Sequence, residues 1–190
     1  MKTAKKYGKP PCLFKAGISP DDFWRLAQSF DLQGDWSQMV YMYFDTSLQS
    51  NDAELYNRDL RLRVRIKDEK KSLELKDYRD GRHWDVPQRI SEEEFRGVLQ
   101  GQLPEGEIGR IISVLSLQGH LRCVKVANTI RKKICIEDGI LVLDMTLWPA
   151  ARYEVEYRSE NKDIPSTVTN IRQVFCPEAR QHDKMEELWA

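Results

Sequence analysis

The chain has 190 residues, of which 41% are hydrophobic and 32% charged. This length suits one domain with a sizeable apolar core, so we expect a single domain over residues 1–190. Thirty basic and thirty acidic side chains cancel to a formal net charge of zero. That balance argues against a protein that holds a nucleic-acid duplex or an anionic membrane by bulk attraction. An anion site in this chain therefore has to be a local concentration of positive charge.

We expect neither a secretory signal peptide nor a cysteine-based site from this sequence. The N-terminal stretch MKTAKKYGKPPC has no apolar signal-peptide core, and apolar runs such as GILVLDMTLW are short and interrupted. We therefore expect a cytoplasmic protein that does not associate with membranes. The four cysteines have no CxxC spacing and no neighbouring histidines, which predicts neither a zinc site nor a disulfide framework.

The first half of the chain alternates helix signals with strand signals. Ser19 is a good N-cap and Pro20 suits a first helical position, which predicts a helix over 20–31. Ser91 and Glu94 have capping-box spacing and predict a second helix over 91–100. Strand patterns lie between these helices, at 40–47, 60–67 and 71–79.

The second half contains a helical stretch at 106–116 and then at least four more strands between 121 and 158, before a tail at Pro165–Trp189 that also has a helical pattern. A tight hairpin is predicted through Asp138-Gly139. Strands joined by hairpins, with helices in blocks, indicate an antiparallel α+β fold. Seven or eight strands in one domain favour an antiparallel β-barrel with helices packed on the outside, because closure removes exposed sheet edges.

Most of the strands are charged on one face and apolar on the other. The strand at 60–67 shows this most clearly, with arginines at 61, 63 and 65 and apolar residues at 62, 64 and 66. In an ordinary small barrel the charged face would meet water, and no binding function would be needed. The alternative is a barrel with its polar side inward. Basic residues on the middle strands, carboxylates on a late strand and several helices to cover an apolar outer face favour such a tunnel for an anion.

Six short motifs occur in register along these strands: YFDT (43–46), LRLR (60–63), LELK (73–76), TIRKK (129–133), LVLDM (141–145) and YEVEY (153–157). In this order the chain resembles the CYTH superfamily of triphosphate tunnel metalloenzymes from about residue 10 to the C-terminus. The superfamily includes thiamine triphosphatases, inorganic triphosphatases, class IV adenylate cyclases and RNA triphosphatases. The resemblance implies a barrel of about eight antiparallel strands around a bound triphosphate and one or two divalent metals.

The resemblance also implies which residues form the site. The phosphate-binding set would be Lys15, Arg61, Arg63, Lys76, Arg131 and Lys184. The metal ligands would be Asp144, Glu154 and Glu156, whose hard oxygen donors suit Mg²⁺ or Mn²⁺. The partner would be a triphosphate-containing small molecule or polyphosphate, gripped by arginine forks. No catalytic side chain is identified.

The first strand departs from the family pattern. The family signature ExExK is replaced by PCLFK, so that Pro11 and Leu13 stand where two glutamates are expected, although Lys15 remains. Glu74, which shares a face with Lys76, is one candidate replacement for the missing carboxylates. An ion pair between Glu74 and a neighbouring arginine is an equally good interpretation.

Two functions from different classes follow. The first is a metal-dependent phosphohydrolase that acts on inorganic, nucleoside or thiamine triphosphate. The second is a CYTH module that binds polyphosphate or a nucleotide but has lost productive metal geometry. A cyclase is a lesser variant, because no adenine pocket is identified. The substrate, the number of metals and the oligomeric state are open at the level of sequence.

Overall fold

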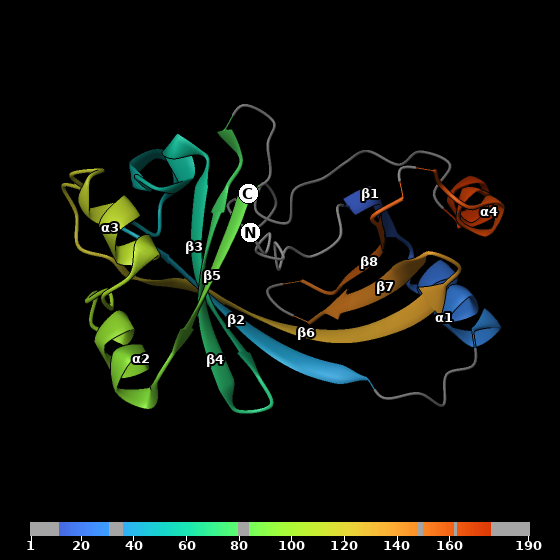
Figure 1. Ribbon diagram of the computed structural model, residues 1–190, viewed down its shortest axis with the longest axis horizontal. Coiled ribbons are helices and arrows are strands. Elements are labelled where there is room, and N and C mark those ends of the chain that lie inside the picture. Colours follow the sequence, from blue (N-terminus) through green and yellow to red (C-terminus); the bar gives the residue numbers. More distant parts are fainter. Residues whose placement is uncertain (1–11, 31–35, 80–83, 148–149, 162, 176–190) are drawn as a thin grey trace, which may run out of the picture. The chain divides into compact units, whose positions relative to one another are not determined.

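The computed structural model describes residues 12–30, 36–79, 84–147, 150–161 and 163–175 (Figure 1). Within these residues, eight strands form one sheet in the order β1-β8-β7-β6-β2-β3-β4-β5. The pairs β1–β8, β7–β8, β2–β3, β3–β4 and β4–β5 are antiparallel. The predicted α+β class with an eight-stranded antiparallel sheet is therefore confirmed.

The strands are β1 (Cys12–Ile18), β2 (Ser37–Asp45), β3 (Leu60–Lys67), β4 (Lys70–Asp77), β5 (Trp84–Ile90), β6 (Arg122–Ile136), β7 (Gly139–Thr146) and β8 (Arg152–Ser159). The α-helices are α1 (Pro20–Ser29), α2 (Glu92–Leu99), α3 (Glu107–Ser113) and α4 (Ser166–Phe175). Two short 3₁₀ helices, η1 (Ser50–Asp52) and η2 (Tyr56–Arg58), precede β3.

The chain forms two compact units. The terminal unit contains β1, α1, the Ile130–Thr146 segment, β8 and α4. The central unit contains Ser37–Thr129, which holds β2 to β5, α2, α3 and the first part of β6. Strand β6 contributes residues to both units.

In the terminal unit, α1 and α4 cover the apolar face of the strands (Figure 1). Phe23 of α1 and Val168 of α4 are fully buried in one cluster with Leu143, Val155 and other strand residues. Helix α1 begins as predicted, because the Ser19 hydroxyl accepts a hydrogen bond from the Asp22 backbone N–H at 3.1 Å.

In the central unit, α2 and α3 cover the apolar face of β3, β4 and β5 (Figure 1). Among the strand residues of this core, Leu62, Val64, Leu73 and Leu75 are fully buried. The predicted capping box is present at the start of α2. Glu94 N–H donates to the Ser91 hydroxyl at 3.1 Å, and Ser91 N–H donates to the Glu94 carboxylate at 2.6 Å.

The helices thus take the apolar strand faces in both units, and the charged residues occupy the opposite faces. Arg61 and Arg63 are nevertheless only 6% and 8% exposed, so these arginines are not solvated surface residues. The interpretation in which the arginines simply face water is wrong for the central unit. The expectation that the charged residues of both units line one tunnel stays a prediction.

Several local expectations were inaccurate. The predicted 20–31 helix ends at Ser29, and the predicted C-terminal helix is observed only as α4, since 176–190 lies outside the described residues. Strand β5 was missed because Pro87 interrupts its pattern, although a proline is tolerated at a sheet edge. No helix in the described part of the chain is long and apolar enough to cross a membrane.

The β6–β7 turn is displaced by one residue from the predicted Asp138-Gly139. The turn residues are Glu137 and Asp138, and Glu137 has a left-handed φ of 47°. Gly139 is already the first residue of β7. A β-carbon at Gly139 would collide with the Tyr157 hydroxyl, so the glycine is required by packing rather than by the turn.

Candidate functional site

The central unit carries a cationic face on β3 and β4. Arg61, Arg63 and Arg65 alternate along β3, and Arg61 lies opposite Lys76 while Arg63 lies opposite Glu74. These two strands therefore place Arg61, Arg63, Arg65, Lys76 and one carboxylate on the face away from the helices, and Lys67 and Lys70 continue that face at the turn between the strands. Strand β5 adds one acid and one base opposite β4, so the surplus of positive charge is unchanged. We call this surface the cationic face.

Glu74 is held between two guanidinium groups and is fully buried. Its Oε2 accepts hydrogen bonds from Arg63 Nε at 2.9 Å and Arg63 Nη2 at 2.6 Å. Its Oε1 lies 3.0 Å from Arg65 Nε. The ion-pair interpretation of Glu74 is therefore the one that the geometry supports, and its carboxylate is already fully engaged.

Tyrosine rings lie against the arginines of the cationic face. The Arg61 guanidinium lies 4.2 Å from the ring centre of Tyr56 and 5.5 Å from that of Tyr78. Arg63 lies 4.4 Å from the ring of Tyr41. A guanidinium packed flat on a ring keeps its edge directed at other partners, so these contacts orient the donors without consuming them. In the sequence, this role is signalled only by the period-two tyrosines Tyr41 and Tyr43 of β2.

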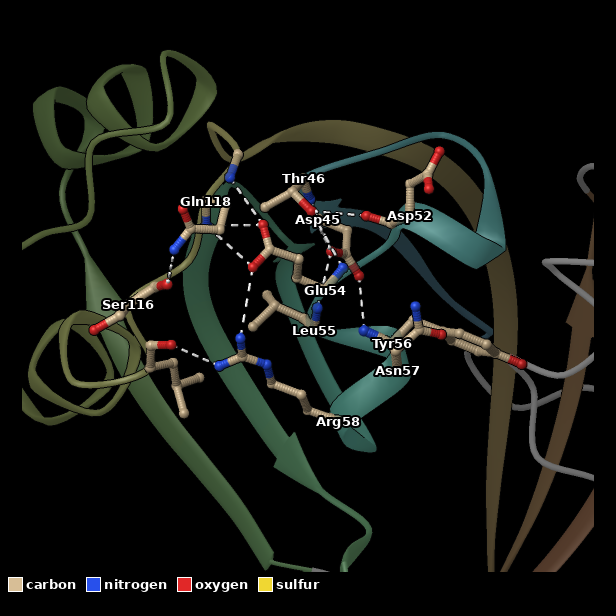
Figure 2. A network of polar contacts seen from close by, with 12 residues as sticks. Asp45, Thr46, Asp52, Glu54, Leu55, Tyr56, Asn57, Arg58, Ser116 and Gln118 are labelled. Atoms are coloured by element: carbon tan, nitrogen blue, oxygen red, sulfur yellow. Dashed lines mark hydrogen bonds and ion pairs between the residues drawn. The ribbon is translucent and has the colours of Figure 1, made fainter.

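A buried carboxylate anchors the segment that carries Tyr56 (Figure 2). Asp45 ends β2 and is 3% exposed. Its Oδ1 accepts hydrogen bonds from the N–H of Thr46 at 2.7 Å and of Leu55 at 3.0 Å, and its Oδ2 accepts one from the N–H of Tyr56 at 2.8 Å. Asp45 of the YFDT motif therefore holds in place the loop that leads into η2.

A second carboxylate ties the same loop to the segment before β6 (Figure 2). Glu54 accepts hydrogen bonds from the N–H of Gln118 at 2.9 Å and of Gly119 at 2.8 Å. Arg58 Nη2 lies 3.6 Å from its other oxygen. Glu54 thus joins two loops, whereas Asp45 organises the start of η2.

The terminal unit carries an acidic face on β7 and β8. Asp144 lies directly opposite Glu154, and Glu156 follows two residues later on the same face. The three residues are only 4%, 8% and 7% exposed, respectively. Buried carboxylates of this kind need partners, because an uncompensated buried charge is strongly destabilising.

Each of these three acids has a basic partner at close range. The pairs are Asp144 with Arg131 (two contacts of 2.6 Å), Glu154 with Lys15 (3.1 Å) and Glu156 with Arg158 (2.5 Å). Burial alone would raise the pKa of Glu156, but Arg158, the Cys12 thiol, Lys15 and Arg131 outweigh it and hold that pKa below its ordinary value.

The acidic face can be tested for its fit to a divalent metal. Carboxylate oxygens are the right donors for Mg²⁺ or Mn²⁺. Among the described residues, however, no three acidic, histidine or cysteine side chains are grouped as a metal site. The reason is that Asp144, Glu154 and Glu156 each form an ion pair with a different basic side chain. As arranged, the acidic face does not fit a metal ion.

Strand β1 places a different residue on the acidic face than expected. Cys12 pairs with Arg158 but Phe14 pairs with Tyr157, so Leu13 is the extra residue of a bulge. Leu13 packs against the helix-covered core. Partial burial of the thiol, together with the carboxylate of Glu156 beside it, raises the pKa of Cys12 to about 12. Leu13, which stands where the family has a glutamate, therefore does not share a face with the carboxylates, and Cys12 takes that place.

The structure thus distributes the predicted site residues between the units. Arg61, Arg63 and Lys76 lie together on the cationic face. The terminal unit brings together Lys15, Arg131, Asp144, Glu154 and Glu156. Lys184 and Pro11 lie outside the described residues.

These features define a class of protein: an α+β fold with an eight-stranded antiparallel sheet whose strands carry charge on the face away from the helices. The sequence matches the CYTH domain over residues 14–183, and the chain belongs to the CYTH domain family. The comparison with curated proteins gave no match.

Solved structures share this fold. A candidate adenylate cyclase from Bacillus halodurans matches with a TM-score of 0.81 at 24% identity, over 96% of this chain and 100% of that one. A candidate adenylyl cyclase from Hippeastrum, described as having a dominant triphosphatase activity, matches with a TM-score of 0.70 at 20% identity, over 90% and 91%. A protein from Pyrococcus horikoshii matches with a TM-score of 0.53 at 15% identity, over 92% and 98%.

Proposed function

We propose that this protein binds a triphosphate-containing small molecule or polyphosphate through its cationic face. The observation that carries the proposal is the surplus of cations on β3 and β4, where the basic side chains outnumber the one carboxylate. Arg61 and Arg63 are almost fully buried there, so water screens their charges only weakly. Membership of a family whose members act on triphosphates supports the class of ligand.

The chemistry of the face suits a chain of phosphates. A guanidinium presents paired N–H donors that match two phosphate oxygens, while an ammonium acts as a point charge. Arg61 and Lys76 lie opposite each other on the adjacent strands β3 and β4, which places one guanidinium beside one ammonium group. Charge-assisted hydrogen bonds at such a buried site are worth about 2 kcal/mol each.

Hydrolysis that depends on Mg²⁺ or Mn²⁺ is the second candidate. It is favoured by the presence of three carboxylates on one face of β7 and β8, and by the dominant triphosphatase activity described for the Hippeastrum protein. The engagement of each carboxylate by its own cation speaks against rapid turnover. We therefore place binding before catalysis.

Calorimetric titration with inorganic tripolyphosphate at low salt tests the proposal. The wild type is expected to bind, and Arg61→Ala is expected to bind roughly thirtyfold more weakly, the equivalent of about 2 kcal/mol. Arg25→Ala is the matched control, because Arg25 is an exposed arginine on α1 that pairs with Asp22. No binding by the wild type, or equal losses in both variants, would overturn the proposal.

A phosphate-release assay separates the two candidates. Inorganic triphosphate, thiamine triphosphate and ATP are each supplied with Mg²⁺ and with Mn²⁺. A rate of roughly one per second or faster that falls about a hundredfold in Glu156→Gln would place hydrolysis first. Tight binding with negligible release from all three compounds would support the binding module.

A further inference from the structure

Asp45 is a buried carboxylate that no motif-based role explains. We propose that Asp45 is a positioning residue: it fixes Tyr56 beneath the guanidinium of Arg61 and so holds Arg61 ready for the anion. This inference rests on the proposed function, since it assigns a purpose to the orientation of Arg61. It extends that function to the last residue of β2, which lies outside the cationic face of β3 and β4.

The donors around Asp45 show that its role is local. Its two oxygens accept hydrogen bonds from three backbone N–H groups, those of Thr46, Leu55 and Tyr56. The Thr46 hydroxyl lies 3.4 Å from the same carboxylate. The three carboxylates of the acidic face each pair with a basic side chain, whereas both oxygens of Asp45 are directed at the loop that begins η2 (Figure 2).

Tyr56 links Asp45 to Arg61 through three contacts. Its backbone N–H donates to Asp45 Oδ2 at 2.8 Å. Its ring centre lies 4.2 Å from the Arg61 guanidinium carbon, and its backbone carbonyl accepts a hydrogen bond from Arg61 Nη1 at 3.1 Å. Because the ring and the carbonyl belong to one residue, any movement of Tyr56 shifts both contacts to Arg61 together.

The consequence for binding is a reduced entropic penalty. A free arginine side chain loses rotamer entropy when it is immobilised. At Arg61 this loss has already occurred during folding, because Tyr56, together with the Leu60 carbonyl and the Tyr78 ring, holds the guanidinium before any anion arrives. The anion then meets an oriented donor, which is the general advantage of a preorganised site.

The geometry also says why a carboxylate is needed. Oδ1 serves Thr46 and Leu55, and Oδ2 serves Tyr56. An asparagine that kept its one acceptor oxygen on the first two donors would turn its amide N–H₂ toward the N–H of Tyr56. Donor would then face donor, so Asp45→Asn is expected to displace Tyr56 while leaving most of the loop anchored.

The test combines tripolyphosphate calorimetry with NMR of the Arg61 side chain. Asp45→Asn and Tyr56→Leu are each expected to weaken binding about fivefold, and Tyr56→Phe, which keeps the ring, is expected to weaken binding less than Tyr56→Leu. In an Arg61→Ala background, Asp45→Asn and Tyr56→Leu are expected to have almost no further effect on binding. Glu54→Gln is the matched control: it removes a charge from the same network but contacts Gln118 and Gly119 instead of Tyr56.

The ring-current shift of the Arg61 side-chain protons reports the geometry without any ligand. We expect this shift to be present in the wild type and in Glu54→Gln. We expect it to be lost in Asp45→Asn and in Tyr56→Leu. An unchanged shift in Asp45→Asn, or losses of affinity that persist in the Arg61→Ala background, would overturn the positioning role. A wild type that shows the shift but binds no tripolyphosphate would overturn the proposed function, and with it the purpose of the arrangement. Thermal unfolding of every variant identifies losses that are due only to misfolding.

Discussion

Replacing Glu74 with glutamine is expected to change stability and binding in opposite directions. The carboxylate is fully buried, with Arg63 at 2.6 Å and Arg65 at 3.0 Å. Glu74→Gln leaves the neighbouring guanidinium charges without their counter-ion in a site that water hardly reaches. Removing one member of a buried pair destabilises by about 3–5 kcal/mol. Because glutamine keeps a neutral acceptor, we expect a loss near the lower limit, about 3 kcal/mol.

A loss of this size is easily measured. For a chain of this length, each kcal/mol shifts Tm by about 2–4 °C, so the midpoint of thermal unfolding is expected to fall by about 6–12 °C. The affinity for tripolyphosphate should rise at the same time, because the anion no longer competes with Glu74 for Arg63. Unit charges about 4 Å apart interact by about 4 kcal/mol at an effective dielectric constant of 20, so a gain of at least tenfold is expected.

Glu69→Gln is the matched control, since Glu69 is an exposed acid at the β3–β4 turn and its replacement makes the same change in net charge. It is expected to leave Tm unchanged and to raise affinity only slightly, because exposed charges are screened. Weaker tripolyphosphate binding by a folded Glu74→Gln protein would refute the reasoning. It would mean that Glu74 orients Arg63 for the ligand rather than competing with the ligand for it.

Three further predictions follow from the terminal unit. Cys12→Asp is expected to strengthen Mn²⁺ binding measured by titration, because position 12 faces the acidic strands. Leu13→Glu is expected only to lower Tm, because Leu13 packs against the core. Stronger Mn²⁺ binding in Leu13→Glu alone would disprove the bulged register. The pKa of Glu156 lies below its usual 4.5, so its ionised form stabilises the fold above that pH and the stabilisation disappears as the pH falls through the lowered value. The difference in unfolding free energy between wild type and Glu156→Gln should therefore shrink in acid denaturation curves below pH 4.5, and a difference that grows would contradict the sign. Gly139→Ala is expected to destabilise by about 1–3 kcal/mol in urea unfolding, since the added methyl group collides with the fully buried Tyr157; an unaffected midpoint would show that the tyrosine can move aside.

The sequence alone determined the features that depend on local periodicity. Alternation along 60–67 identified β3 with its observed bounds and separated its arginines from its buried leucine and valine. The capping pair Ser91 and Glu94 located the start of α2. Such signals are readable because period two, capping and the burial of apolar faces involve residues that are close in the chain. The order of the six motifs then indicated the family.

Only the tertiary structure decided how the charges are paired. Arg131 with Asp144, and Lys15 with Glu154, are partners from different strands. The sequence shows how many charges share a face, but pairing depends on register, which one bulged residue in β1 alters. Tyr56 is likewise placed under Arg61 by the hydrogen bond from its backbone to Asp45. These contacts are fixed by the three-dimensional course of strands and loops, because side-chain electrostatics acts over a few ångströms in space and not along the chain.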